Sequence, residues 1–242
     1  MKIVGIVPCR YGAVRFPGKS LADIHGKPMM WHVYQQALKA ESLDEVFIAT
    51  DDQRILDACD GLGLNTILTS TEHATGTDRL AECATIIDSD IYVNVQGDEP
   101  MIVPEAIDRV ARGILESDDS DMLAANGFND IHVATDVIDT NVVKVIIDIK
   151  GRALAYSRQP IPYPKDGPVQ YHRQLGLYAF RKLGLETFSA KQPGPVEAAE
   201  GVEMLRFLEH GYSIKMVRVP DDDGIPVDTP SDLKRVRDMM AK

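Results

Sequence analysis

Long apolar runs and an excess of positive charge are both missing from this sequence. None of its 242 residues lies in a stretch that approaches the roughly 20 consecutive apolar residues of a membrane span, so we expect no membrane partner. The net charge of −11 argues against a nucleic-acid partner, because nucleic-acid-binding proteins usually present a net basic face. Any cluster of cations in such an acidic chain therefore indicates local chemistry.

Cysteine is scarce and unpatterned. The three cysteines, Cys9, Cys59 and Cys83, show no C-x-x-C spacing, which fits a reducing cytosol and argues against structural zinc. The chain begins directly in a strand-like run without a secretory signal pattern, so we expect a cytoplasmic location. No nucleophile constellation is present, and the six histidines show no spacing of a base with an orienting group.

A cationic, glycine-containing loop follows the first apolar run, 3–7. The loop, 8–20, carries Arg10, Arg15 and Lys19 together with two glycines. Glycine lets the backbone approach phosphate oxygens, and the three cations supply charge-assisted hydrogen-bond donors. The pattern predicts a strand that ends at a nucleotide triphosphate site, the alternative being a basic surface loop with scattered salt bridges.

Two common nucleotide motifs are excluded by counting. Five residues separate Gly12 from Gly18, where the P-loop pattern before Gly-Lys-Ser allows four. The segment after Ser20 also breaks at Gly26, where a P-loop runs into a long helix. The loop lacks G-x-G-x-x-G as well, which argues against a dehydrogenase.

Strand-like and helix-like segments then alternate along the chain, which predicts a single α/β domain over 1–242 with a mostly parallel sheet. Helical patterns extend over 28–40 and 55–62, from Thr77 as N-cap to 87, from Pro104 onward, over 197–208 and from Thr229 onward. Strand patterns occupy 46–50, 66–68, 91–95, 122–125, 175–180 and 214–219, with a hairpin of 142–148 and 153–156. The proline-rich excursion 157–168 is a candidate dimer arm or substrate lid.

Two aspartates lie at the ends of predicted elements, where their carboxylates are free to bind a ligand. Asp98 follows the most buried-looking strand, and Asp228 precedes the helix cap formed by Thr229. Carboxylates beside a triphosphate predict magnesium ligands, although Asp98 could instead cap the helix that Pro104 begins. The polar loop 70–79 lies at the same predicted sheet edge, and its hydroxyl groups serve either base recognition or helix capping.

The combination of motifs resembles the 3-deoxy-manno-octulosonate (Kdo) cytidylyltransferase family. The matching segments run nearly from end to end: 8–11, 15–19, 26–29, 49–52, 76–82, 94–100, 141–145, 156–158, 176–178, 205–206 and 227–232. Several are long and specific, among them the Asn-Val-Gln-Gly-Asp-Glu-Pro segment at 94–100.

The resemblance implies a nucleotide-diphospho-sugar transferase fold, Rossmann-like with helices on both sheet faces, Mg²⁺ dependence and a homodimer with a dimerisation and sugar-binding arm at about 142–200. It assigns catalytic roles to Arg10, Lys19, Asp98 and Asp228, and magnesium binding to the two aspartates. The implied nucleotide-binding residues are Pro8, Arg10, Arg15, Lys19, Thr77, Arg79 and Gln96. The implied sugar-binding residues are Gln96, Arg158, Gln174, Tyr178, Glu203 and Met204.

The implied reaction transfers CMP from CTP to the anomeric hydroxyl of a 3-deoxy-2-ulosonic acid, with release of pyrophosphate, for surface-polysaccharide synthesis. Gln174 and Met204 depart from the family pattern, which usually has His and Gln there. This motivates the alternative of a different acid acceptor, such as an amino-substituted ulosonate or a phosphonate. A non-catalytic nucleotide-sugar binding protein is the alternative from another class, and it predicts loss of cations or metal ligands that are all present.

Overall fold

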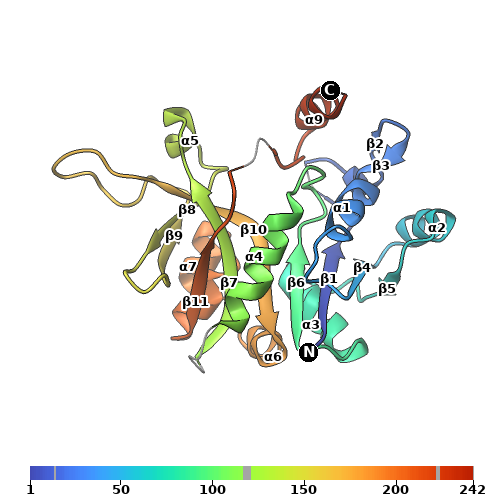
Figure 1. The fold of residues 1–242 in the computed structure, drawn as a ribbon, viewed down its shortest axis with the longest axis horizontal. Helices are drawn as coiled ribbons and strands as arrows, with labels where there is room; N and C mark the ends of the chain where they lie inside the picture. Colours follow the sequence, from blue (N-terminus) through green and yellow to red (C-terminus); the bar gives the residue numbers. More distant parts are fainter. Residues whose placement is uncertain (14, 117–120, 222–223, 242) are drawn as a thin grey trace.

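A mixed β-sheet passes through the whole of the computed structural model, which describes residues 1–13, 15–116, 121–221 and 224–241 (Figure 1). Its strand order is β11-β7-β10-β6-β1-β4-β5. These strands are β1 (Ile3–Pro8), β4 (Glu45–Thr50), β5 (Thr66–Leu68), β6 (Ile91–Val95), β7 (Met122–Asp130), β10 (His172–Arg181) and β11 (Ser213–Arg218). Only β10 runs antiparallel to its neighbours β6 and β7 along this described path. The predicted α/β fold with a mostly parallel sheet is confirmed.

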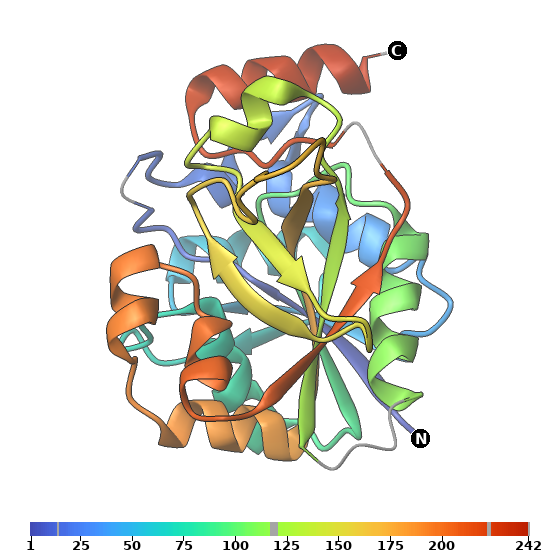
Figure 2. The ribbon, with the colours of Figure 1, turned by 90° about the vertical axis from the view of Figure 1, so that its left-hand side faces the viewer.

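Helices cover both faces of the sheet, as Figure 2 shows. One core cluster packs α1 (Met29–Ala37), α2 (Gln53–Leu62) and α4 (Pro104–Leu115) against the sheet. The opposite cluster contains α3 (Gly76–Ile86), α6 (Lys182–Ala190) and α8 (Leu205–Glu209). The residues of β6 alternate between the two cores and are all buried, because a sheet covered on both sides needs apolar strands on both faces.

The second half adds a hairpin and an excursion to this frame. The predicted hairpin forms as β8 (Lys144–Ile147) and β9 (Ala153–Ser157), and β8 pairs with β10. The short helix α5 (Ala134–Ile138) precedes it, and the excursion that follows β9 projects from the molecule in Figure 1. Near the N-terminus lie η1 (Lys19–Leu21) and the pair β2 (Asp23–Ile24) and β3 (Lys27–Pro28).

Helix α9 (Pro230–Met240) is anchored by a separate small core of Ile24, Met29, Val227, Leu233 and Val236. This packing brings the C-terminal helix back to the segment that follows the N-terminal loop. No helix in the described part of the chain is both long and apolar enough to cross a membrane.

Three local predictions need correction. The N-cap of α3 is Thr75, whose side chain accepts from the Asp78 backbone N–H in a capping box, and Thr77 lies inside the helix. Pro28 is the N-cap of α1 and does not lie in its first turn. The helix expected over 197–208 is two helices, α7 (Pro195–Glu200) and α8, because Gly201 at φ 61° ends α7 in the left-handed conformation.

Candidate active site

The parallel strands place the predicted phosphate loop beside the loop that carries Asp98. Strands β1 and β6 are parallel neighbours, so their carboxyl ends meet at one edge of the sheet. The backbone N–H of Cys9 donates to the carbonyl of Ala49 at 2.8 Å, which ties the start of the loop to β4. Open α/β sheets bind their ligands at this edge.

The loop folds back on Tyr11. Its carbonyl accepts from the N–H groups of Ala13 at 2.9 Å and Gly18 at 2.7 Å. Gly18 has φ 73° and a Cβ there would lie 3.0 Å from the Tyr11 ring, so both conformation and space require glycine. The Arg54 guanidinium stacks 3.2 Å from the centroid of the same ring and pairs with Asp52 at 2.6 Å. These contacts give the loop a defined shape.

Asp98 and Asp228 converge on the ammonium of Lys19. Its Nζ lies 2.6 Å from Oδ2 of Asp98 and 3.0 Å from Oδ1 of Asp228. It also donates to the carbonyl of Val227 at 3.1 Å. Arg15 pairs with the other oxygen of Asp228 at 2.8 Å. The predicted meeting of the two aspartates is therefore confirmed, and the cation between them is a lysine.

The charge state of Lys19 follows from these neighbours. Burial disfavours its charged form, but the carboxylates of Asp98 and Asp228 outweigh that effect and hold the pKa of Lys19 above its ordinary value. The ammonium is therefore charged at neutral pH. Among the described residues no group of three or more His, Cys, Asp and Glu side chains is placed to hold a metal ion.

Pro8, Thr77 and Gln96 gather around Gly76 at the start of α3. A Cβ on Gly76 would lie 3.6 Å from Cγ of Pro8 and 3.7 Å from Nε2 of Gln96. Thr77 is fully buried, and its hydroxyl oxygen has no hydrogen-bond partner within the described chain. The strands thus bring these three predicted nucleotide-binding residues to one place.

Arg10 and Arg79 have opposite environments. Arg10 is exposed at the end of β1. The side chain of Arg79 is only 5% exposed and pairs with Asp51 at 2.8 Å, with a second short hydrogen bond to the hydroxyl of Thr69. Arg79 therefore joins α3 to the ends of β4 and β5 in this structure, a structural role that sequence reasoning missed.

A buried polar patch lies beside the start of α3. It is formed by Thr77, Asn94, Asn126, Tyr178 and Glu203. Tyr178 stands opposite both asparagines in the strand register. Both polar side-chain atoms of Asn94 and Oδ1 of Asn126 have no partner in the described structure. Buried polar groups without partners are costly, so they mark a place where a polar ligand or water fits. Asn94 and Asn126 were absent from the predicted site.

Burial shapes the titration of this patch. Burial raises the pKa of Glu203, whose carboxylate accepts from the backbone N–H of Thr77 at 3.3 Å. Burial and the neighbouring Glu203 carboxylate hold the pKa of Tyr178 well above its ordinary value. Its hydroxyl accepts from Nε2 of Gln174 at 2.7 Å, so Gln174 orients it as a neutral hydrogen-bonding group.

The side chains of Arg158 and Met204, two predicted sugar-binding residues, are engaged in contacts within the chain. Met204 is fully buried in one of the hydrophobic core clusters, so its side chain is packed in this structure, and its sugar-binding role stays a prediction. The guanidinium of Arg158 donates to the carbonyls of Glu200 at 2.7 Å and Thr140 at 2.8 Å, which joins the arm to α7.

Cys9 is a packed residue of the loop. Burial raises the pKa of its thiol to about 12, which the nearby cations do not offset. A thiol with this pKa is protonated at neutral pH and is no nucleophile. The interpretation of Cys9 as a small core residue is confirmed.

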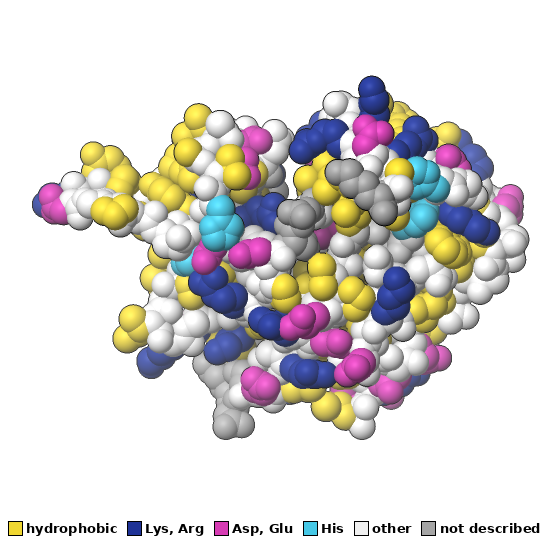
Figure 3. Space-filling model, turned by 45° about the horizontal axis from the view of Figure 1, so that its top comes forward, with side chains coloured by type: hydrophobic (Ala, Val, Ile, Leu, Met, Phe, Trp, Pro, Cys, Tyr) yellow, Lys and Arg dark blue, Asp and Glu magenta, His cyan; other side chains and the backbone are white. Residues whose placement is uncertain are grey.

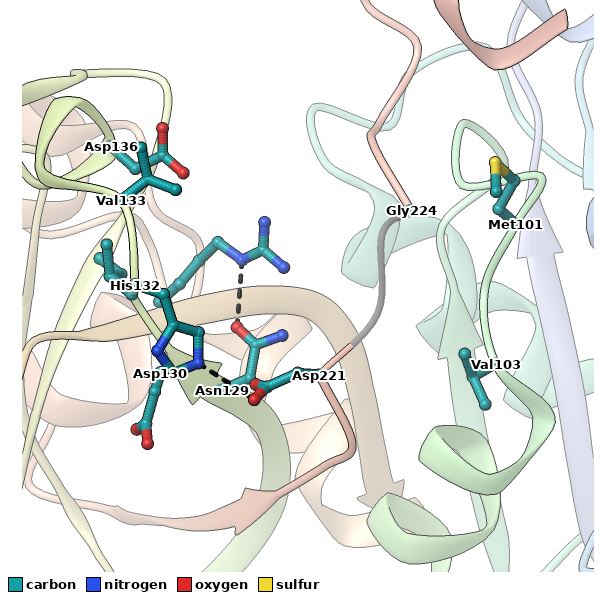
Figure 4. A pocket seen from close by; sticks show the side chains of 11 residues that line it. Met101, Val103, Asn129, Asp130, His132, Val133, Asp136, Asp221 and Gly224 are labelled. Atoms are coloured by element: carbon teal, nitrogen blue, oxygen red, sulfur yellow. Dashed lines mark hydrogen bonds and ion pairs between the residues drawn. The ribbon is translucent and has the colours of Figure 1, made fainter. Parts of the chain in front are cut away.

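A pocket of about 610 Å³ lies beyond this loop, between Met101 and Val103 on one side and the ends of β7 and β10 on the other (Figure 4). Its lining offers the carboxylates of Asp130 and Asp136 and the guanidinium of Arg173, which donates to Asn129 at 3.2 Å. A triphosphate needs several cations, and three stand on the loop, at Arg10, Arg15 and Lys19, so this loop remains the better phosphate site.

Comparisons with known proteins place the chain. The cytidylyltransferase family model matches residues 4–215. A 3-deoxy-manno-octulosonate cytidylyltransferase of Geotalea uraniireducens is 44% identical over 254 aligned positions, covering 100% of both chains. This chain belongs to the 3-deoxy-manno-octulosonate cytidylyltransferase family. A second cytidylyltransferase of this kind, from Geotalea daltonii, is 45% identical and covers 98% of the chain and 97% of the relative.

Solved structures agree with this membership in the cytidylyltransferase family. A CMP:2-keto-3-deoxy-manno-octonic acid synthetase complexed with CTP has a TM-score of 0.93 and 39% identity, covering 100% of this chain and 99% of the other. A 4-diphosphocytidyl-2C-methyl-D-erythritol synthase from Anaerococcus prevotii has a TM-score of 0.63 at 15% identity, which shows the shared fold alone. The predicted nucleotide-diphospho-sugar transferase fold and nucleotidyltransferase class are confirmed.

Proposed function

We propose that this cytidylyltransferase transfers CMP from CTP to the anomeric hydroxyl of Kdo and releases pyrophosphate. The observation that carries the proposal is the convergence of Asp98 and Asp228 on Lys19, beside a buried polar patch. The full-length similarity to a synthetase solved with CTP supports the choice of nucleotide. The product would serve surface-polysaccharide synthesis such as that of lipopolysaccharide.

The oxygen donors at the two aspartates fit Mg²⁺. The carboxylates of Asp98 and Asp228 and the carbonyl of Val227 already surround one cation, the Lys19 ammonium. They are the hard oxygen ligands that Mg²⁺ prefers, and water and phosphate oxygens complete its shell when a site offers few carboxylates. Mg²⁺ held there would acidify the sugar hydroxyl and neutralise charge at the α-phosphate.

The chain's own residues supply alignment and charge. Arg10, Arg15 and Lys19 would bind the triphosphate and stabilise the departing pyrophosphate. Pro8, Thr77, Arg79 and Gln96 would shape the nucleotide side of the site. Transfer of CMP to a hydroxyl asks for positioning more than for covalent chemistry, which matches a site whose loop thiol, Cys9, is buried and protonated.

The sugar side would be formed around the buried polar patch. Tyr178, held by Gln174, and the partly buried Glu203 present polar groups to an acid sugar. Arg158 would hold the arm against α7, and Met204, the residue after Glu203, would act through its packing in the core. The catalytic and sugar-binding roles in this proposal rest on the family resemblance together with these positions.

Pyrophosphate release tests the function directly. We expect the purified protein to release pyrophosphate from CTP when Kdo and Mg²⁺ are present. A change of nucleotide to UTP or GTP should lower kcat/KM at least about 100-fold, because a site that forms hydrogen bonds with the cytosine base rejects a base with different hydrogen-bond donors. An amino-substituted ulosonate, a phosphonate and a reaction without acceptor complete the panel. Efficient turnover of another acid in preference to Kdo would support the alternative acceptor that Gln174 motivates. Acceptor-independent or absent pyrophosphate release would contradict the transferase.

We also propose that the enzyme is a homodimer formed through the region around 142–200 and the adjoining α5. The large apolar side chains there that are more than half exposed are Val133, Ile138, Ile149, Leu154, Tyr163 and Leu183. Figure 3 shows the projecting excursion with hydrophobic side chains along it. Such grouping is typical of an interaction surface.

Light scattering of the purified protein is expected to give about twice the chain mass of 26.7 kDa. Ile138→Asp with Leu154→Asp should shift the mass to that of one chain, because charge is costly in an apolar interface. Ile86→Asp, at an exposed apolar residue on α3 outside this region, is the control. A wild-type mass of one chain would contradict the dimer.

A cytoplasmic site of action is also proposed. It is supported by Cys9, Cys59 and Cys83, which are all buried and unpaired. Retention of full activity in a strongly reducing buffer is expected, and loss of activity on reduction would contradict it.

A further inference from the structure

The ammonium of Lys19 occupies the place between the two carboxylates of the site. Its three N–H donors match three oxygens, on Asp98, Asp228 and Val227, at 2.6, 3.0 and 3.1 Å. The Lys19 side chain is only 15% exposed, so this arrangement is largely shielded from water. A lysine with all three donors engaged has none to offer to a phosphate in the same position.

The local charge is balanced without any ligand. Arg15 lies 2.8 Å from the second oxygen of Asp228, so two cationic side chains face two aspartates. A divalent cation that entered this group would meet Lys19 and Arg15 within a few ångströms, and the attraction of the carboxylates is already offset. An arriving triphosphate changes the balance, because it offers the two cations a stronger anionic partner.

Exposed Arg10 stands at the entrance of the same loop. It has no hydrogen bond or ion pair to any residue within the described ranges, whereas Lys19 and Arg15 are both engaged. It is therefore the cation of the loop that meets an incoming phosphate at no cost in broken ion pairs.

We propose that Lys19 is an internal counter-ion that closes the magnesium site until a nucleotide binds. The triphosphate draws Lys19 and Arg15 away from the carboxylates, and the vacated oxygens of Asp98 and Asp228 then accept the divalent ion. Metal and nucleotide bind with positive coupling, and the protein alone has low metal affinity. This inference rests on the proposed magnesium-dependent use of CTP and adds the order in which the site fills.

Mn²⁺ binding followed by electron paramagnetic resonance tests the closure without any turnover. Titrations are made on wild-type protein and Lys19→Gln, both without nucleotide. The removal of one cation within hydrogen-bond distance of the two carboxylates is expected to tighten Mn²⁺ binding about tenfold or more. Arg15→Gln, on an exposed side chain, should tighten it by a smaller factor of about two to five.

Two further variants separate charge from general disturbance. Lys19→Arg retains the cation and should leave Mn²⁺ affinity low. Lys182→Gln breaks a comparable ion pair with Asp88 at 3.1 Å on the surface and should change nothing. If Lys19→Gln does not fold, Arg15→Gln decides the question, because its side chain lies outside the core.

Wild-type protein that binds Mn²⁺ without nucleotide as tightly as the charge-removing variants would overturn the inference. This result is distinct from a failure of the proposed function, which would appear as absent CMP-Kdo formation by the wild type. A wild-type enzyme that forms CMP-Kdo and also binds Mn²⁺ tightly without nucleotide would refute only the proposal that Lys19 closes the metal site. Gain of Mn²⁺ affinity in Lys19→Gln, together with a wild-type protein that forms no CMP-Kdo, would refute the proposed reaction and support the closure.

Discussion

Replacement of Asp98 by Asn is expected to lower kcat about a thousandfold, at the upper end of what removal of a single electrostatic stabiliser costs. The side chain keeps its size, so the loop after β6 keeps its packing. The change removes one of the two charged oxygens proposed for magnesium and weakens the 2.6 Å contact with Lys19. Pyrophosphate release at saturating CTP, Kdo and Mg²⁺ measures the effect.

The matched control is Asp60→Asn on the exposed face of α2, which should retain the wild-type rate. Thermal unfolding of both variants shows whether the fold persists, and we expect both to melt cooperatively. A wild-type rate in Asp98→Asn would remove this residue from the mechanism, whatever the melting curves show.

Replacement of Glu197 by Ala is expected to lower the free energy of unfolding by about 3–5 kcal/mol, because it leaves a buried guanidinium without its main counter-charge. Arg206 and Glu197 have side chains only 4% and 7% exposed. Three hydrogen bonds of 2.7, 2.9 and 3.2 Å join them, and Arg206 also pairs with Asp78 at 3.2 Å. Urea unfolding followed by circular dichroism gives the value.

The exposed pair Arg109 and Glu105 provides the comparison for the same type of change. It spans one turn of α4 at 2.6 Å, with side chains 45% and 57% exposed. Glu105→Ala should cost less than about 1 kcal/mol, because water screens an exposed pair. Equal losses in the two variants would show that burial of the Arg206 network contributes nothing to stability.

The Arg206 network also connects the core to the site. Asp78 accepts from Arg206 and completes the capping box of Thr75 at the start of α3. The same turn holds Thr77 and Gly76 against the nucleotide position. Arg206, which the sequence showed only as part of the family motif Leu205-Arg206, thus supports α3, the helix that shapes the site.

Local patterns were sufficient for much of the fold. The N-cap of α9 at Thr229, Pro230 in its first turn and Asp232 three residues after the cap are all recognisable because each acts on backbone groups within one turn. The end of α2 at Gly63 is of the same kind, since a left-handed C-cap favours glycine. The apolar run of β6 predicted a strand buried on both faces for a similarly local reason.

Local patterns could not predict which of two neighbouring threonines forms the N-cap of α3. Thr75 and Thr77 both precede an apolar helical pattern, and only the reciprocal contact of Thr75 with Asp78 distinguishes them. The division between α7 and α8 was missed for a related reason, because the periodicity of apolar residues continues across Gly201 while the backbone turns.

The sequence by itself determined the family, the α/β fold and the cations and aspartates of the site, because motifs and periodicity act over short stretches of chain. Only the tertiary structure decided that Lys19 lies between Asp98 and Asp228, that Arg79 is occupied by Asp51 and that Met204 is enclosed in the core. These facts depend on contacts between residues up to 209 positions apart, which are set by the packing of α9 and the sheet and by no local preference.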